Sequence, residues 1–231
     1  MPEPTTCYNF AMQKVIATWS GGKDSCFAAY KVIQQGYEIA CIANTISKEY
    51  KRVRFHGLSA EIIKKQSEAI GIPLLQQETT SENYEEEFKA NLQKGLSKDI
   101  AGIVFGDIHL KDCLTWANKV STSLGVKVIE PLWHMPQEQI LKDFIEAGFE
   151  AVIVSTQANI LGEEWIGRRI DSQFLKDIKA LKNVDICGEN GEYHTLVLDG
   201  PIFKMRLEIE KSESILREGY WFLDIQKYQV V

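Results

Sequence analysis

The sequence predicts an α/β protein with a doubly wound, mainly parallel five-stranded sheet, followed by a smaller C-terminal α+β domain. Two observations support this fold class. Short apolar runs, often β-branched, alternate with segments that are apolar at helical spacing as far as Ile129. After Glu130-Pro131-Leu132-Trp133 that alternation gives way to a mixed pattern. We therefore expect an N-terminal domain over residues 1–133 and a C-terminal domain over residues 134–231.

The N-terminal half contains five strand-like runs separated by four helical segments. The predicted strands are Lys14–Trp19, Tyr37–Ala43, Pro73–Gln76, Ala101–Phe105 and Val126–Ile129. Glycine or a Gly-x-Pro sequence ends three of the helical segments, as is common at helix C-termini. These segments run from about Asp24 to Gly36, from Leu58 to Ile70, from a serine cap at Ser81 to Leu96, and from Leu110 to Leu124.

The C-terminal half mixes the two periodicities. Pro136 suits the first turn of a helix that ends at Gly148, and a second helix is predicted from Asp171 to Leu181. A loop rich in glycine and glutamate spans residues 188–192. The predicted strands are Glu150–Ser155, Thr195–Leu198, Arg206–Ile209 and Tyr220–Ile225.

Composition excludes several classes of protein. Hydrophobic residues make up 45% and charged residues 25% of the chain, which excludes a disordered chain or a small disulfide scaffold. Lys and Arg number 26 against 32 Asp and Glu, so the net charge of −6 disfavours nucleic acid as a partner. No membrane-spanning or signal segment is recognised. The five cysteines form no CxxC pair, so we expect reduced thiols in a cytoplasmic protein.

The strongest local signal is Ser20-Gly21-Gly22-Lys23-Asp24-Ser25, between a predicted strand and a predicted helix. Glycines allow the backbone to turn sharply and to approach a ligand closely. The N–H groups at the start of a helix favour an anion, and Lys23 adds a positive charge. A plain serine-capped turn would rarely need all these features. The loop therefore predicts a phosphate-binding site formed by Ser20, Gly21, Gly22, Lys23, Asp24 and Ser25.

This loop lacks the spacings of the Walker and dinucleotide-binding motifs and instead resembles the PP-loop of the ATP pyrophosphatases. That resemblance implies the adenine nucleotide alpha hydrolase-like (HUP-type) fold and ATP as cofactor. It also implies that the six loop residues bind the pyrophosphate portion of ATP. Mg²⁺ would bridge the phosphate oxygens and offset their charge.

Four motifs together make the chain resemble one particular family of PP-loop enzymes. Thr18–Ser25, Phe105-Gly106-Asp107, Glu130–Trp133 and Gly188–Thr195 occur in the same order as in the diphthine–ammonia ligase family. The resemblance covers nearly the whole chain. It implies an enzyme that adenylates a carboxylate with ATP, releases pyrophosphate and forms an amide with ammonia. The charged stretch 48–57 is most similar to the bacterial branch of the family, where the acceptor carboxylate is unidentified.

Asp107 follows a predicted strand, at the edge where this fold places its ligand. We expect Asp107 to be catalytic and to hold Mg²⁺ together with Asp24, with Gly106 beside them against the nucleotide. An alternative is that Asp107 caps the helix that begins near His109. The two roles are not exclusive.

Glu189 and Glu192 lie three residues apart in a loop bounded by glycines. With Lys23 and Asp24, they are our candidates for catalysis, because two carboxylates could orient ammonia or hold a cation. The alternative is a solvated acidic turn. His56 follows the second strand, where related folds place adenine and ribose, although a surface histidine is an equally simple interpretation.

Two other functions stay open at this point. An RNA-modifying PP-loop enzyme would bind tRNA in a salt-sensitive way, and a non-catalytic module would bind an adenine nucleotide without turnover. The sequence also leaves open the acceptor carboxylate, the source of ammonia and whether the chain forms a homo-oligomer.

Overall fold

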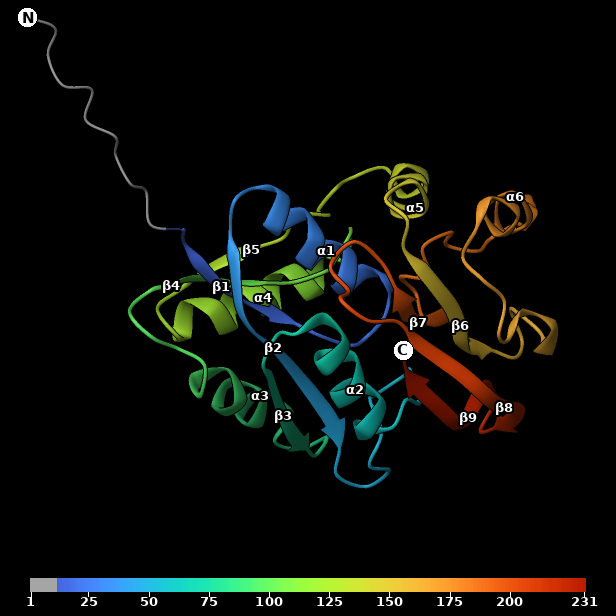
Figure 1. The fold of residues 1–231 in the computed structure, drawn as a ribbon, viewed down its shortest axis with the longest axis horizontal. Coiled ribbons are helices and arrows are strands. Elements are labelled where there is room, and N and C mark those ends of the chain that lie inside the picture. The colour runs from blue at the N-terminus through green and yellow to red at the C-terminus, as the bar shows by residue number, and fades with distance from the viewer. Residues whose placement is uncertain (1–11) are drawn as a thin grey trace, which may run out of the picture.

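The computed structural model describes residues 12–231 and contains two sheets that lie side by side (Figure 1). The N-terminal sheet is parallel, with the strand order β3-β2-β1-β4-β5. Its strands are β1 (Lys14–Thr18), β2 (Glu38–Ser47), β3 (Leu74–Thr79), β4 (Ile100–Val104) and β5 (Lys127–Ile129). The C-terminal sheet is antiparallel, with the order β7-β6-β9-β8. Its strands are β6 (Glu150–Gln157), β7 (Tyr193–Asp199), β8 (Leu207–Arg217) and β9 (Tyr220–Val230).

Helices cover both faces of the parallel sheet, which confirms the predicted doubly wound α/β class. Apolar side chains of α1 (Lys23–Gln34) and α2 (Ala60–Ile70) pack on one face. Those of α3 (Tyr84–Gln93) and α4 (Lys111–Ser123) pack on the other. Two further helices, α5 (Gln137–Glu146) and α6 (Ser172–Ala180), belong to the C-terminal half, as does the 3-10 helix Glu163–Trp165.

Some predicted boundaries were wrong. The hairpin strands β8 and β9 run well beyond their predicted ends, because many of their side chains face solvent and give a weak apolar pattern. Ser81 does not cap α3, whose N-cap is Asn83. The charged stretch 48–57 is anchored by isolated bridges from Val53 to Ile46 and from Arg52 to Ser59. Val53 is buried, so this stretch is attached to the core.

One apolar core joins the two halves of the molecule. The face of the parallel sheet that carries α1 and α2 packs in the same cluster as the C-terminal helices and the inner strands of the second sheet. Phe27 from α1 meets Phe144 from α5 edge to face, with ring centroids 5.9 Å apart, and Phe144 stacks on Phe149 at 4.8 Å. The predicted boundary near residue 133 stays a prediction, and the contacts across it are extensive.

The strand order reverses between β1 and β4, which sit side by side in the sheet. Ligands in such sheets bind beyond the carboxyl ends of the strands at this point. The segments that leave these two strands are the predicted phosphate loop and Phe105-Gly106-Asp107. The fold therefore brings two of the four sequence motifs to one place.

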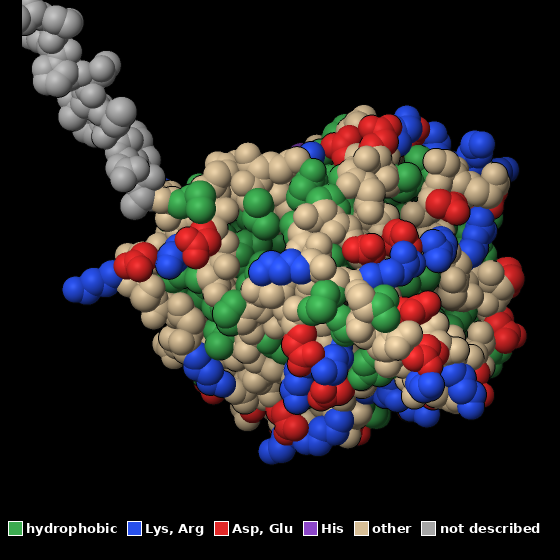
Figure 2. Space-filling view, in the orientation of Figure 1, with side chains coloured by type: hydrophobic (Ala, Val, Ile, Leu, Met, Phe, Trp, Pro, Cys, Tyr) green, Lys and Arg blue, Asp and Glu red, His purple; other side chains and the backbone are tan. Residues whose placement is uncertain are grey.

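On the face shown in Figure 2, basic and acidic side chains are interleaved. Within residues 12–231, no helix combines the length and the apolar character that crossing a bilayer requires.

Because the core is shared, we expect Phe144→Ala to destabilise both halves. Truncating this fully buried ring should cost about 3–5 kcal/mol of unfolding free energy. Urea unfolding followed by tryptophan fluorescence and by far-UV circular dichroism should still give one coincident transition, shifted to lower urea. Two separate transitions would show that the halves are stabilised independently.

Candidate active site

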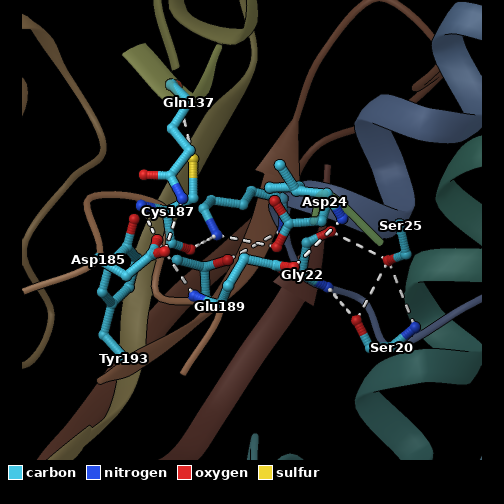
Figure 3. A network of polar contacts seen from close by, with 12 residues as sticks. Ser20, Gly22, Asp24, Ser25, Gln137, Asp185, Cys187, Glu189 and Tyr193 are labelled. Atoms are coloured by element: carbon cyan, nitrogen blue, oxygen red, sulfur yellow. Dashed lines mark hydrogen bonds and ion pairs between the residues drawn. The ribbon is translucent and has the colours of Figure 1, made fainter. Parts of the chain in front are cut away.

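The phosphate loop is held in shape by its own serines (Figure 3). Gly22 is the N-cap of α1, and Gly21 has a φ of +85°, a backbone conformation that favours glycine. The hydroxyls of Ser20 and Ser25 lie 3.2 Å apart. The Ser20 hydroxyl accepts a hydrogen bond from the Gly22 amide at 3.3 Å, and the Ser25 hydroxyl donates to the Gly22 carbonyl at 3.1 Å. The turn is therefore organised by contacts within the loop.

Two glycines at the site are required by close packing. A Cβ atom at Gly22 would lie 2.7 Å from His56 Cε1 and 3.0 Å from the Thr195 carbonyl oxygen. A Cβ atom at Gly106 would lie 2.9 Å from the Asp24 carbonyl carbon and 3.0 Å from the Ser25 nitrogen. Gly106 thus lies directly against the first turn of α1, and its predicted place beside the nucleotide stays a prediction.

The C-terminal sheet supports the loop from behind. The Val197 amide of β7 donates to the Gly21 carbonyl at 2.9 Å, and the Lys23 amide donates to the Thr195 hydroxyl at 2.9 Å. Gln66 of α2 is fully buried and donates to the carbonyls of Gly21 and Val197 at 3.0 and 2.7 Å. The loop is therefore clamped between α2 and β7.

The Lys23 ammonium group lies beneath the loop and not at its surface. It donates to Asp24 at 2.8 Å and to the Cys187 carbonyl, and it lies 4.9 Å from the centroid of the Tyr193 ring (Figure 3). Burial lowers the pKa of Lys23, but the attraction of Asp24, Tyr193 and Cys187 and the hydrogen bond to Asp24 together outweigh it, so the pKa is raised above its ordinary value. Lys23 therefore stays charged and ties the first turn of α1 to the C-terminal loop.

Carboxylates gather in front of this turn. Burial and the nearby Asp24 raise the pKa of Asp107 from 3.8 to about 6. Burial and Asp107 raise the pKa of Glu130 from 4.5 to about 7. Asp24 Oδ1 and both oxygens of Glu130 are buried without a hydrogen-bond partner among residues 12–231. The cluster consequently holds more negative charge than the surrounding described residues neutralise.

The two predicted glutamates differ in position. Glu189 accepts a hydrogen bond from the Ile108 amide at 3.2 Å, and burial, followed by Asp24, raises its pKa to about 7. It therefore joins the cluster from the C-terminal side. The carboxylate oxygens of Glu192 instead accept from the amides of Asp185 and Asn190, at 2.9 and 3.1 Å. Glu192 is 3% exposed and holds its own loop together.

His56 packs against the phosphate loop and pairs with a second histidine. Its Nδ1 lies 3.0 Å from the Thr195 carbonyl oxygen, which identifies Nδ1 as the donor. The rings of His56 and His194 are 4.7 Å apart. Burial lowers the pKa of His56 to about 4 and that of His194 well below 6.5. Both rings are therefore neutral near pH 7.

Three residues of the site were not predicted from the sequence, although each has a sequence feature that could have identified it. Gln66 is a polar residue within the apolar stripe of its helix. Glu130 directly follows β5, at the same edge of the sheet as the site. Asp185 accepts from Gln137 at 2.6 Å and from the Cys187 amide at 2.8 Å, and lies just before the recognised motif.

The structure also bears on the possible helix cap at Asp107, on two of the cysteines and on metal sites. Asp107 does not cap α4, whose N-cap is Leu110, so its alternative role is excluded. Cys26 is buried, and burial raises the pKa of its thiol, so it packs in the core as a neutral side chain. Cys7 lies outside the described residues. Within the described chain no group of three or more His, Cys, Asp or Glu side chains has the arrangement of a complete metal site.

Comparisons with known proteins agree with this geometry. The model of the diphthamide synthase N-terminal domain matches residues 13–128, and that of the diphthamide synthase C-terminal domain matches residues 136–231. The chain belongs to the diphthamide synthase family. The resemblance to a family of ATP-dependent ligases that the motifs predicted is therefore confirmed.

Curated relatives carry the name diphthine–ammonia ligase. The protein of Rattus norvegicus is 26% identical over 92% of this chain and 88% of its own length, as is that of Homo sapiens. The protein of Schizosaccharomyces pombe is 27% identical over 87% of this chain, which spans 37% of that longer relative.

We expect Gly106→Ala to weaken ATP binding strongly. The added methyl group would meet backbone atoms of Asp24 and Ser25, which cannot move without distorting the first turn of α1. Isothermal titration should show a loss of affinity of about tenfold or more, equivalent to about 1.4 kcal/mol. The exposed Lys98→Ala serves as control and should bind ATP normally. Unchanged affinity of Gly106→Ala would place the nucleotide elsewhere.

The raised carboxylate pKa values predict the pH dependence of stability. These three carboxylates bind more protons in the native state than in the unfolded state between about pH 4 and pH 7, so their contribution to the unfolding free energy falls as pH rises through that window. His56 and His194, whose pKa values are lowered, contribute in the opposite direction. Asp107→Asn should raise the unfolding free energy at pH 8 by on the order of 1 kcal/mol. Exposed Asp99→Asn is the matched control. Urea titrations at pH 5 and pH 8 measure the unfolding free energy of both variants. A loss of stability at pH 8 in Asp107→Asn would contradict the view that the buried charge of Asp107 destabilises the native state.

Proposed function

We propose that this chain is a ligase that uses ATP to adenylate a carboxylate, releases pyrophosphate and forms an amide with ammonia. The observation that carries the proposal is the clamped, glycine-rich turn at the start of α1, at the switch point of the sheet. Family membership supports the reaction class. By their name, the curated relatives act on diphthine and ammonia.

The loop suits the phosphates of ATP because the N–H groups of a first helical turn have no partner within the helix. The Lys23 amide is already bound to Thr195, so the neighbouring amides of Asp24 and Ser25 are the free donors of this turn. Gly106 packs against the backbone of these two residues, where a Cβ atom would not fit. Lys23 neutralises part of the carboxylate cluster, which lowers the electrostatic cost of bringing a polyphosphate close.

The reaction then proceeds in two balanced steps. A carboxylate oxygen of the acceptor attacks the α-phosphorus of ATP, and the bond to the β-phosphate breaks to release pyrophosphate. Ammonia next attacks the acyl carbon, AMP leaves with the oxygen, and the nitrogen loses a proton. Adenylation turns a poor leaving group into a good one, and the protein contributes positioning and charge stabilisation.

The carboxylate cluster fits Mg²⁺. This ion is commonly held by one or two carboxylates plus substrate phosphates, so a complete protein cage is unnecessary. Asp24 and Asp107 would hold it, with Glu130 alongside. The unpartnered oxygens of Asp24 and Glu130 and the raised pKa values of Asp107 and Glu130 indicate uncompensated negative charge. When bound, Mg²⁺ supplies charge compensation for the triphosphate.

Glu189 suits the ammonia step. It enters the cluster from the C-terminal domain, and its pKa of about 7 leaves it partly ionised at neutral pH. A carboxylate with such a pKa can attract an ammonium ion and accept its proton. Glu192 supports this role indirectly, because it fixes the loop that carries Glu189.

Product analysis tests the proposal. The protein is incubated with ATP, Mg²⁺, ammonia and either a diphthine-bearing acceptor or a panel of small carboxylates. We expect AMP and pyrophosphate in equal amounts, formed only when an acceptor is present. Glu189→Gln should reduce turnover by about 10²–10³-fold with little change in ATP affinity, whereas exposed Glu146→Gln should behave as wild type.

Release of ADP and phosphate would overturn the mechanism. Tight ATP binding without AMP formation from any acceptor would instead support the non-catalytic alternative. Salt-sensitive binding of tRNA would favour the RNA-modifying alternative.

A further inference from the structure

Helix α2 carries a side-chain amide into the apolar core behind the phosphate loop. Gln66 is fully buried, although it shares the helix with the buried apolar side chains of Ile62, Ile63, Ala69 and Ile70. A buried amide costs free energy unless its polar atoms find hydrogen-bond partners. Gln66 makes three hydrogen bonds, and all of them join it to the loop, to the residue before the loop or to β7.

Trp19, the residue before the loop, orients this amide. Its indole Nε1 donates to Gln66 Oε1 at 2.7 Å. An indole N–H can only donate, so the amide oxygen of Gln66 must face Trp19 and the amide nitrogen must face away. The nitrogen accordingly donates to the carbonyls of Gly21 and Val197. Trp19 is 3% exposed, and Asn44 donates to its carbonyl at 2.8 Å, so the indole is itself held in place.

The peptide group between Gly21 and Gly22 is held by two donors. The Gly21 carbonyl accepts from the Val197 amide at 2.9 Å and from Gln66 Nε2 at 3.0 Å. In a trans peptide the C=O and N–H groups point in opposite directions. The Gly22 N–H therefore points away from Gln66, and it donates to the Ser20 hydroxyl at 3.3 Å (Figure 3).

Both residues that flank this peptide are glycines, so their own backbone would allow it to flip. A flip changes ψ of Gly21 and φ of Gly22, and glycine accepts φ of either sign. The flipped peptide would turn a carbonyl oxygen toward Ser20, on the side of the loop where we expect the phosphates of ATP. An N–H group attracts phosphate oxygens, whereas a carbonyl oxygen repels them. Binding of a polyphosphate therefore requires the unflipped form.

We propose that Gln66 is a positioning residue for ATP, because it keeps the Gly21–Gly22 peptide from flipping and so presents an N–H group to the polyphosphate. This inference rests on the proposed ligase function. Gln66 acts on the peptide directly through the Gly21 carbonyl. It also binds the carbonyl of Val197, whose amide is the second donor, so it fixes the strand that helps it. Trp19 keeps the donor side of the amide turned toward both carbonyls.

The variant Gln66→Met tests the proposal, because methionine has a similar length and no hydrogen-bond donor. Isothermal titration of the intact protein uses ATP and inorganic pyrophosphate, each with Mg²⁺. We expect the affinity for ATP to fall by about 10- to 100-fold, since a good donor to the phosphates is replaced by a carbonyl in part of the molecules. The affinity for pyrophosphate should fall by a similar factor, because the peptide acts on the phosphates and not on the nucleoside.

The matched control is Ser67→Ala, on the same helix. Ser67 is buried, and its hydroxyl donates to the Ile72 carbonyl at 2.6 Å, so this variant loses a buried hydrogen bond behind α2. It should unfold at lower urea and still bind ATP and pyrophosphate as the wild type does. Equal losses of affinity in the two variants would reduce Gln66 to a structural role and overturn the inference. Wild-type affinity in Gln66→Met would overturn it as well.

A milder variant keeps the test decisive if Gln66→Met does not fold. Trp19→Phe keeps an aromatic ring in the core and removes the donor to Gln66 Oε1. The amide can then turn around and place its oxygen against the carbonyls of Gly21 and Val197. We expect the affinity for ATP to fall by about threefold or more. Unchanged affinity in Trp19→Phe would show that the orientation of Gln66 has no effect on the loop.

The amide resonance of Gly22 reports the flip without any ligand. In the isotope-labelled wild type and in Ser67→Ala we expect the same single resonance. In Gln66→Met it should move and broaden, because two orientations of the peptide exchange. A Gly22 resonance that is unchanged in Gln66→Met would contradict the proposed flip.

The wild type separates this inference from the ligase function. If it binds ATP and forms AMP while Gln66→Met is indistinguishable from it, the ligase stays and only the role of Gln66 is removed. If the wild type binds neither ATP nor pyrophosphate, the ligase function falls and this inference falls with it.

Discussion

The site depends on the clamp that holds the phosphate loop between α2 and β7. On one side the loop is hydrogen-bonded to β7: the Val197 amide donates to the Gly21 carbonyl, and the Lys23 amide donates to the Thr195 hydroxyl. On the other side, the Gln66 side chain of α2 donates hydrogen bonds to the carbonyls of Gly21 and Val197. A turn with a left-handed glycine would otherwise sample many conformations. These hydrogen bonds select one of them, so the loop has a fixed shape without a bound ligand.

Electrostatics impose the second constraint. Several carboxylates crowd the carboxyl edge of the sheet, and Lys23 alone cannot balance them. Such a cluster destabilises the empty protein, and cations offset that cost when they bind. The same arrangement explains the raised carboxylate pKa values and the unpartnered oxygens, and it agrees with the proposed binding of Mg²⁺ and ammonium.

The fold class could be predicted from the sequence, because the alternation of strands and helices and the glycines that end helices are local sequence features. The sequence also placed the loop residues and Asp107 after neighbouring strands of the sheet, where the structure has them, and their roles stay predictions. It could not reveal that the Lys23 ammonium faces Cys187, or that Glu192 binds its own loop, because both depend on how the domains pack. The long hairpin of β8 and β9 was underestimated, because Glu208, Glu210 and Glu213 interrupt its apolar pattern.

The continuous apolar core has a consequence for how such a protein can be divided. A chain cut near residue 133 would leave Phe27 and the apolar sides of α1 and α2 in water. The nucleotide-binding half is therefore not a portable module that could be fused to another partner unchanged. Any rearrangement that keeps it functional must bring along a replacement surface of similar shape.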